Sequence, residues 1–191
     1  MSFDSRRGAP LYSVFACGCL KMSVCEEFQT PPGAETDARW MRAAIDAARA
    51  AAREHDEVPV GACVVSDVGE LLAVAGNRTR TDCDPTAHAE VVALRAAAQR
   101  VGNYRLTGAT VYSTIEPCAM CAGALVQARV ERLVYGARDE RAGAVESVFR
   151  ICDASFLNHR LELTPGVLEA ECRELMQAFF RARRKAMMND E

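Results

Sequence analysis

Two short motifs in this 191-residue sequence combine residue types that bind metal ions. The first, "DPTAHAE", spans residues 84–90, and the second, "EPCAMC", spans residues 116–121. They supply His88, Cys118 and Cys121, and thiolate and imidazole groups are the usual protein ligands of zinc. The two motifs therefore predict a metal site, provided that the fold brings them together.

The spacing of the two cysteines favours joint binding of one ion. Residues three apart lie on the same side of a helix, and Pro117 is typical of a first helical position. The N–H groups and dipole of a helix N-terminus stabilise thiolates, so Cys118 and Cys121 should deprotonate readily. With His88 as third ligand, a tetrahedral zinc ion would keep one position for water, which is typical of catalytic sites.

Glu90 is the candidate for proton transfer. Zinc bound by two thiolates and a neutral imidazole carries no net charge. Such a site should acidify its bound water less than a three-histidine site would, so a nearby proton acceptor becomes important. Residues 88 and 90 point ~200° apart on an ideal helix, so we expect both to face a pocket beyond its N-terminal end. Glu90 would take a proton from zinc-activated water and deliver protons to the ring nitrogen and leaving amine of a substrate.

The Cys-x-x-Cys pair taken alone admits two other interpretations. A thioredoxin-like dithiol also lies at a helix start, but it would leave His88 and Glu90 without a role, and Trp-Cys-Gly-Pro-Cys surroundings are missing. A structural zinc site would require a fourth protein ligand, for which Cys83 is the nearest candidate.

Composition limits the classes of partner. The net charge is −3 and the pI is about 5.7, so RNA binding would require a local basic patch. Nine cysteines without the spacing of a disulfide framework indicate a reducing, cytoplasmic location. No apolar run approaches the ~20 residues of a membrane helix.

The length favours one domain, preceded by a different segment. Residues 1–35 show no sustained helical period and end near Pro31-Pro32-Gly33, so we expect a poorly ordered extension. A short apolar stretch at 11–20 superficially resembles a secretory signal but lacks a clear cleavage site. We expect the domain to span 36–188, followed by a tail of 189–191.

The domain alternates helical and strand patterns. We predict a hairpin from strands 58–66 and 70–77, further strands at 109–115 and 130–137, and a strand or extended segment at 160–164. We predict helices over about 36–54, 85–100, 117–128 and 165–187, and a loop-and-helix region up to 158. The expected helix caps are Thr36-Asp37, Asp84, more weakly Glu116, and Thr164. This alternation implies parallel strands with helices on both faces, joined to one antiparallel hairpin.

His-Ala-Glu followed by Pro-Cys-x-x-Cys resembles the signature of the zinc-dependent nucleobase deaminases. The runs "NYRLTGATVYSTIEPCAMCAGALVQARVERLVYGARD" and "LNHRLELTPGVLEAECRELMQAFFRARRK" are similar to the bacterial tRNA-specific adenosine deaminases of this cytidine/deoxycytidylate deaminase superfamily. The resemblance covers about 37–185. It implies a three-layer α/β/α, cytidine-deaminase-like fold with a mixed sheet of about five strands, usually a homodimer. The implied reaction converts adenosine at the tRNA wobble position to inosine and ammonia.

The resemblance also implies roles for individual residues. His88, Cys118 and Cys121 correspond to the ligands of one zinc ion per subunit, and Glu90 to the proton shuttle. Contacts to the target base are implied for Asn77 and for the backbone N–H of Ala89.

Contacts to the tRNA anticodon stem-loop are expected from side chains that stack on bases or bind phosphates. The candidates are Arg138, Asn158, His159, Phe180 and Arg181. In "FFRARRK" four of the last five residues are basic, which supplies a local positive patch. We expect one of Phe179 and Phe180 to pack in the core. The family usually has a glycine before the serine, where this sequence has Glu146 before Ser147. A carboxylate beside an RNA-binding loop would repel phosphate, so either Glu146 faces away or this loop has another role.

Two other functions share the motifs. A free-base enzyme such as a guanine deaminase would have no use for a basic C-terminal helix, since a free base carries no phosphate. A non-catalytic RNA-binding subunit with structural zinc would have no use for Glu90.

Overall fold

The computed structural model describes residues 33–189, so the expected N-terminal extension lies almost entirely outside the described residues. The strands of this part are β1 (Gly61–Val65), β2 (Leu71–Gly76), β3 (Thr110–Ile115), β4 (Arg132–Ala137) and β5 (Glu162–Pro165). The helices are α1 (Ala34–His55), α2 (Ala89–Val101), α3 (Ala119–Gln127) and α4 (Glu169–Asn189).

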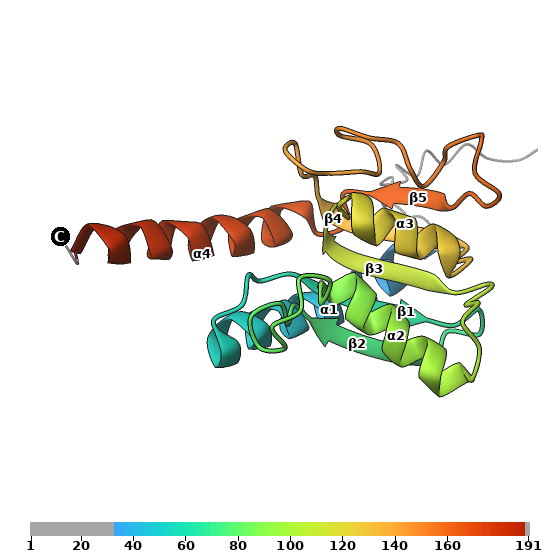
Figure 1. Ribbon diagram of the computed structural model, residues 1–191, viewed down its shortest axis with the longest axis horizontal. Helices are drawn as coiled ribbons and strands as arrows, with labels where there is room; N and C mark the ends of the chain where they lie inside the picture. Colours follow the sequence, from blue (N-terminus) through green and yellow to red (C-terminus); the bar gives the residue numbers. More distant parts are fainter. Residues whose placement is uncertain (1–32, 190–191) are drawn as a thin grey trace, which may run out of the picture. The chain divides into compact units, whose positions relative to one another are not determined.

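The strands form one sheet in the order β2-β1-β3-β4-β5 (Figure 1). β1 is antiparallel to both of its neighbours, whereas β3, β4 and β5 pair in parallel. All strands except β1 therefore run in one direction, and their carboxyl ends share one edge of the sheet. The predicted hairpin and the parallel second half are confirmed.

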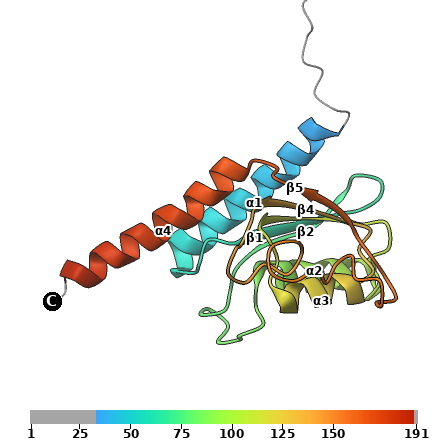
Figure 2. The same ribbon diagram turned by 90° about the horizontal axis from the view of Figure 1, so that it is seen from above.

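Helices cover both faces of the sheet. α2 and α3 lie on one face, and α1 and α4 lie on the other (Figure 2). α1 buries Trp40, Ile45 and Ala48, the side that its pattern predicted. α1 packs so closely on β1 that a Cβ at Gly61 would come within 1.9 Å of the Ala44 carbonyl oxygen. The three-layer α/β/α architecture is confirmed.

The predicted starts of α1 and α2 are wrong, because the expected capping carboxylates bind elsewhere. Asp84 accepts from the backbone N–H and hydroxyl of Thr86 (2.7 Å each), which closes a turn, and α2 begins after His88. At α1 the helix follows Gly33, and Asp37 is buried inside it. The Asp37 carboxylate accepts hydrogen bonds from Tyr112 and Arg132.

The C-terminal part also differs from the prediction. Pro165 ends β5 instead of opening a helix, and the Thr164 hydroxyl accepts a hydrogen bond from Arg132 (2.9 Å). The region 138–161 contains turns and no helix. α4 is anchored on the sheet by Cys172, whereas most side chains beyond Gln177 are exposed. No helix in the described part of the chain is both long and apolar enough to cross a membrane.

Candidate metal centre

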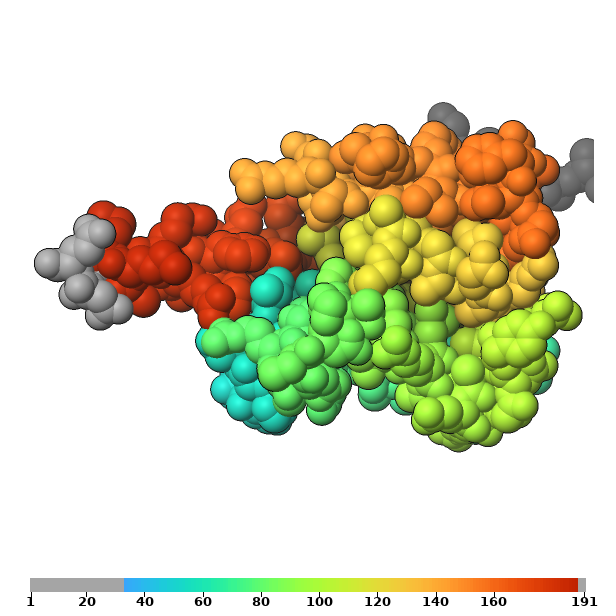
Figure 3. Space-filling view, in the orientation of Figure 1, coloured from blue at the N-terminus to red at the C-terminus, as the bar shows by residue number. Residues whose placement is uncertain are grey.

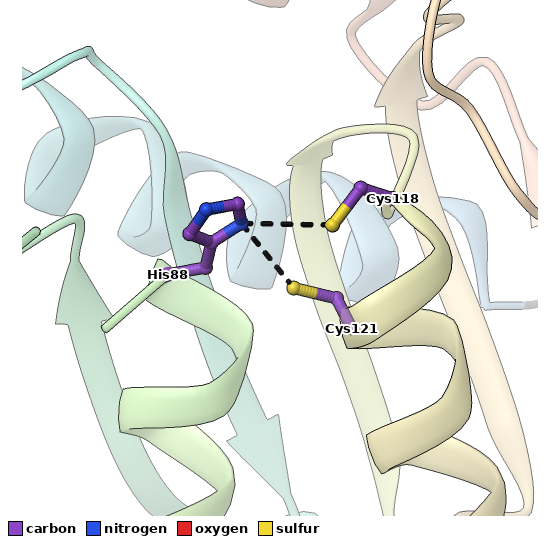
Figure 4. A group of neighbouring side chains, drawn as sticks. All are labelled: His88, Cys118 and Cys121. Carbon is purple, nitrogen blue, oxygen red and sulfur yellow. Dashed lines mark hydrogen bonds between the residues drawn. The ribbon is translucent and has the colours of Figure 1, made fainter. Parts of the chain in front are cut away.

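The two sequence motifs meet at the edge where the parallel strands end. β2 leads through a loop to α2, and β3 leads directly to α3, so the N-termini of both helices lie side by side (Figure 4). His88 is the residue before α2, Cys118 is the residue before α3, and Cys121 lies in the first turn of α3. The two motifs therefore meet beyond the helix N-termini, as predicted. His88 and Cys118 nevertheless precede their helices, whereas the predicted helices 85–100 and 117–128 included both residues.

The donor atoms have the separations that one zinc ion requires. His88 Nδ1 lies 3.7 Å from Cys118 Sγ and 3.6 Å from Cys121 Sγ, and all three donors lie within 4.8 Å of one another. Tetrahedral zinc with its usual bonds to sulfur and nitrogen would separate these atoms by about 3.6 Å. Cys83 is exposed and its sulfur lies near the Arg80 carbonyl, outside this cluster. The described residues thus offer three ligands, not four.

The thiols of Cys118 and Cys121 differ in acidity. The neighbouring Cys121 thiol and His88 ring lower the pKa of Cys118 to about 3. The closeness of Cys118, together with burial and the nearby Glu90, raises the pKa of Cys121. Cys118 is therefore the more acidic of the two thiols, and the fully buried Cys121 would release its proton on binding zinc.

Glu90 lies against the metal ligands, inside the protein. Its Oε2 accepts a hydrogen bond from Cys121 Sγ (3.5 Å). Its Oε1 lies 3.1 Å from the Ser113 hydroxyl, whose single proton can go either to Glu90 or to the Ile115 carbonyl (2.7 Å). Burial raises the pKa of Glu90. Ser113 lies in β3 and belongs to no motif, so no sequence signal indicated it.

The two residues expected to contact a base lie at the same end of the sheet. Asn77 follows β2 directly and is buried, and its Nδ2 donates to the Thr79 hydroxyl (3.5 Å). Ala89 is the first residue of α2, where a backbone N–H has no acceptor within its own helix.

Glu116 has a different role from the weak helix cap that its position suggested. Its carboxylate accepts backbone N–H bonds from four residues, Asp139, Val145, Glu146 and Ser147, and a further bond from the Ser147 hydroxyl. Burial, which alone would raise its pKa, is outweighed by these bonds, so the pKa of Glu116 is lowered. Glu116 thus fastens the loop after β4 to the start of α3.

Glu57 fastens a second loop in the same way. This carboxylate precedes β1 and accepts four hydrogen bonds from Thr79, Arg80 and Thr81, directly after Asn77. Neither arrangement could be predicted from local sequence patterns, because the donors lie more than twenty positions away along the chain.

Arg138 follows β4 and lies at the edge of the sheet that carries the metal ligands. It forms an ion pair with Glu146 (3.3 Å). Glu146 also accepts a hydrogen bond from the Tyr135 hydroxyl. The Glu146 carboxylate is therefore held by side chains of its own chain, and it partly neutralises the charge of Arg138.

A groove of about 550 Å³ lies between the loop after β4 and α4. It is lined by Arg141, Met176, Gln177, Phe180, Arg181 and Arg184. Figure 3 shows this loop, in orange, beside α4, in red. Phe180 is 41% exposed. The guanidinium carbon of Arg183 lies over the Phe179 ring, 5.0 Å from the ring centroid. Neither phenylalanine is therefore part of the core. This is a correction of the expectation that one of the two would be.

Asn158 and His159 lie elsewhere. The ring of His159 donates to the Val130 carbonyl (2.6 Å), and Arg129 donates to the Asn158 carbonyl (2.7 Å). Arg129 and Val130 precede β4, at the edge opposite the metal ligands. The fold therefore does not bring these two residues to the metal centre of the same chain.

Comparison with known proteins agrees with this geometry. The profile of the cytidine and deoxycytidylate deaminase zinc-binding region matches residues 34–137. A curated tRNA-specific adenosine deaminase of Haemophilus influenzae is 44% identical over 79% of this chain and 87% of its own length.

Solved structures are similar as well. A tRNA:A34 deaminase is 45% identical, with a TM-score of 0.69 over 72% of this chain and 98% of the other. A guanine deaminase of Bacillus subtilis is 37% identical, with a TM-score of 0.51 over 52% and 63%. The chain thus belongs to the cytidine and deoxycytidylate deaminase family and, within it, to the tRNA-specific adenosine deaminases.

Proposed function

We propose that this protein hydrolyses adenosine at the wobble position, A34, of a tRNA anticodon loop, which yields inosine and ammonia. The observation that carries the proposal is the cluster of His88, Cys118 and Cys121 with the Glu90 carboxylate against it. This arrangement occurs in a chain whose curated relatives are tRNA-specific adenosine deaminases.

His88, Cys118 and Cys121 would hold one zinc ion per subunit, which supplies a Lewis acid that lowers the pKa of a water molecule. Glu90 would accept a proton from the attacking water and pass protons to the ring nitrogen and the departing amine. Burial raises the pKa of Glu90, and this direction favours a carboxyl group that accepts a proton and passes it on. The Ser113 hydroxyl, 3.1 Å from Oε1, would orient the Glu90 side chain, as a donor to the carboxylate or as an acceptor from the protonated carboxyl group.

Base binding would use groups beside the metal ligands. The Asn77 side chain and the Ala89 N–H would form hydrogen bonds with the edge of an adenine that has left its stack, which is least costly in an unpaired loop. Both residues are buried, so these hydrogen bonds would form away from bulk water.

RNA binding would use the groove beside α4, together with Arg138. Its arginines would bind phosphates, and the exposed Phe180 ring offers a face on which a base could stack. Arg181, one of its lining residues, also forms an ion pair with Glu174 that a phosphate would have to replace. Any contact by Asn158 or His159 would be remote from this chain's own metal centre.

We further propose that the enzyme acts as a homodimer in the cytoplasm. A second, mainly apolar groove of about 360 Å³ includes Val91, Leu94, Tyr104 and Ala124, and Tyr104 is largely exposed there. Such a surface on α2 and α3 would be covered by a second copy of the chain. None of the six cysteines in the described part of the chain forms a disulfide, which agrees with a reducing compartment.

The similarity to a guanine deaminase makes a free base the second candidate substrate. The zinc-loaded protein would be incubated separately with a tRNA that carries A34, with guanine and with adenosine, and inosine and ammonia would be measured. We expect conversion of the tRNA alone. Turnover of guanine without conversion of the tRNA would overturn the proposal in favour of the second candidate.

A further inference from the structure

Glu57 is a charged residue that the proposed chemistry does not use, yet it is completely buried. It accepts three hydrogen bonds on Oε1, from the Arg80 N–H (2.8 Å), the Thr81 N–H (2.8 Å) and the Thr81 hydroxyl (3.0 Å). Its second oxygen, Oε2, accepts one bond, from the Thr79 hydroxyl (3.1 Å). Because Thr79 in turn contacts Asn77, the carboxylate is linked to the residue proposed to hold the base.

The direction of these hydrogen bonds follows from simple chemistry. An ionised carboxylate can only accept, and a hydroxyl group has a single proton to donate. The Thr79 proton is therefore used on Glu57, and its oxygen can only accept from Asn77. The Asn77 side chain must then present its Nδ2 to Thr79, at 3.5 Å, which leaves Oδ1 and the second N–H for other partners.

Glu57 remains ionised at neutral pH. Burial alone would raise its pKa, but the hydrogen bonds from Thr81, Thr79 and Arg80 outweigh burial and lower it. The hydrogen bonds therefore run in one direction, from Asn77 to Thr79 and from Thr79 to Glu57.

We propose that Glu57 is a positioning residue that fixes the orientation of the Asn77 amide through the Thr79 hydroxyl. An amide oxygen and an amide nitrogen have almost the same shape, so packing alone discriminates poorly between the two orientations. A turned amide would offer an acceptor where the base requires a donor, or the reverse. This role rests on the proposed function in so far as Asn77 contacts the base.

Glu57→Gln tests the inference because it changes the hydrogen-bonding pattern and leaves the shape. The glutamine oxygen would keep the three bonds from Arg80 and Thr81, and its NH₂ group would face Thr79. The Thr79 hydroxyl would then accept from residue 57 and donate toward Asn77, which favours the turned amide. We expect kcat/KM for deamination to fall by roughly ten- to a hundredfold, as for one misdirected hydrogen bond to a substrate.

A double-mutant cycle separates positioning from general damage. Thr79→Val removes the hydroxyl, so we expect Glu57→Gln to add little to the loss that Thr79→Val already causes. Glu54→Gln, an exposed glutamate of the preceding helix, is the matched control and should leave kcat/KM unchanged. Zinc content and unfolding temperature are measured for every variant. Losses in kcat/KM that multiply in the double variant would overturn the inference.

Neutron crystallography of the zinc-loaded protein reads the orientation directly, without any assay. We expect the deuteron of the Thr79 hydroxyl to point at Glu57 and the Asn77 ND₂ group to face Thr79. A deuteron that points at Asn77 would overturn the inference. Failure to deaminate any of the three substrates would contradict the proposed function, and the neutron structure would still decide the orientation of Asn77.

Discussion

Glu90 and the pair formed by Glu57 and Glu116 are the same residue type in equally buried places, with exposures of 2%, 0% and 1%. Their pKa values nevertheless move in opposite directions. Burial raises the pKa of Glu90, whereas hydrogen bonds lower the pKa of Glu57 and Glu116 in spite of burial. The number of donors accounts for the difference.

Local structure decides how many donors each carboxylate receives. Glu116 and Glu57 face loops whose backbone N–H groups have no partners within a helix or sheet, and they collect five and four hydrogen bonds. Glu90 lies in α2 and faces the thiol of Cys121 and one hydroxyl. A buried carboxylate surrounded by N–H groups organises a loop, whereas a buried carboxylate with few donors is suited to exchange protons.

The largest effect should come from Glu90→Gln. The glutamine keeps the shape but cannot carry a proton between water and substrate, so we expect kcat to fall by about 10²–10⁴-fold. Zinc content, measured by elemental analysis, should remain at one ion per chain. Substantial deamination by this variant would show that a group other than Glu90 transfers the proton.

Glu116→Gln should affect folding before chemistry. An NH₂ group would replace one oxygen that accepts from the Ser147 hydroxyl and the Asp139 N–H, so donors would face donors. We expect the free energy of unfolding, measured in urea, to fall by about 1–3 kcal/mol. Glu140→Gln in the same loop, at an exposed position, is the control and should change little. Equal effects of the two variants would mean that Glu116 does not hold the loop.

The pH dependence of stability should have opposite signs for the two kinds of carboxylate. Stabilisation by Glu57 and Glu116 is complete above their unfolded pKa of about 4.5 and disappears as the pH falls through their lowered folded values. Glu90 in the zinc-free protein stabilises folding below its unfolded pKa, and this contribution is lost as the pH rises through its raised folded value.

Thermal unfolding of the chelated protein between pH 3 and pH 8 measures both effects. Compared with wild type, Glu116→Gln should lose less stability on acidification. Glu90→Gln should lose less as the pH rises above 5. Parallel curves for the two variants would contradict the assignment by donor number.

The smallest effect should come from Glu146→Gln. Its partner Arg138 is about half exposed, and ion pairs at such positions contribute about 0–1 kcal/mol. We expect a change in unfolding free energy within that range, while tRNA affinity should rise slightly because Arg138 becomes available for phosphate. A loss of stability as large as that of Glu116→Gln would show that a partly exposed carboxylate also holds the loop.

The chemical motifs and the sheet could be predicted from the sequence, because local patterns carry them. His88, Cys118 and Cys121 lie in short motifs, and the strands are apolar runs between turn residues. The starts of α1, α2 and α4 could not, since Asp37, Asp84 and Thr164 had alternative partners, most of them distant in the chain. The roles of Glu57 and Glu116 depend wholly on such distant partners.

The way in which α4 is attached determines which of its residues can be substituted without loss of packing. Only its first turns pack on the sheet, and the half that carries Phe180, Arg181 and Arg184 rests on little else than an ion pair between Arg183 and Asp56 (2.6 Å). Substitutions there meet few packing constraints. Substitutions at this end of the chain would therefore change the proposed RNA contacts while leaving His88, Cys118, Cys121 and Glu90 in place.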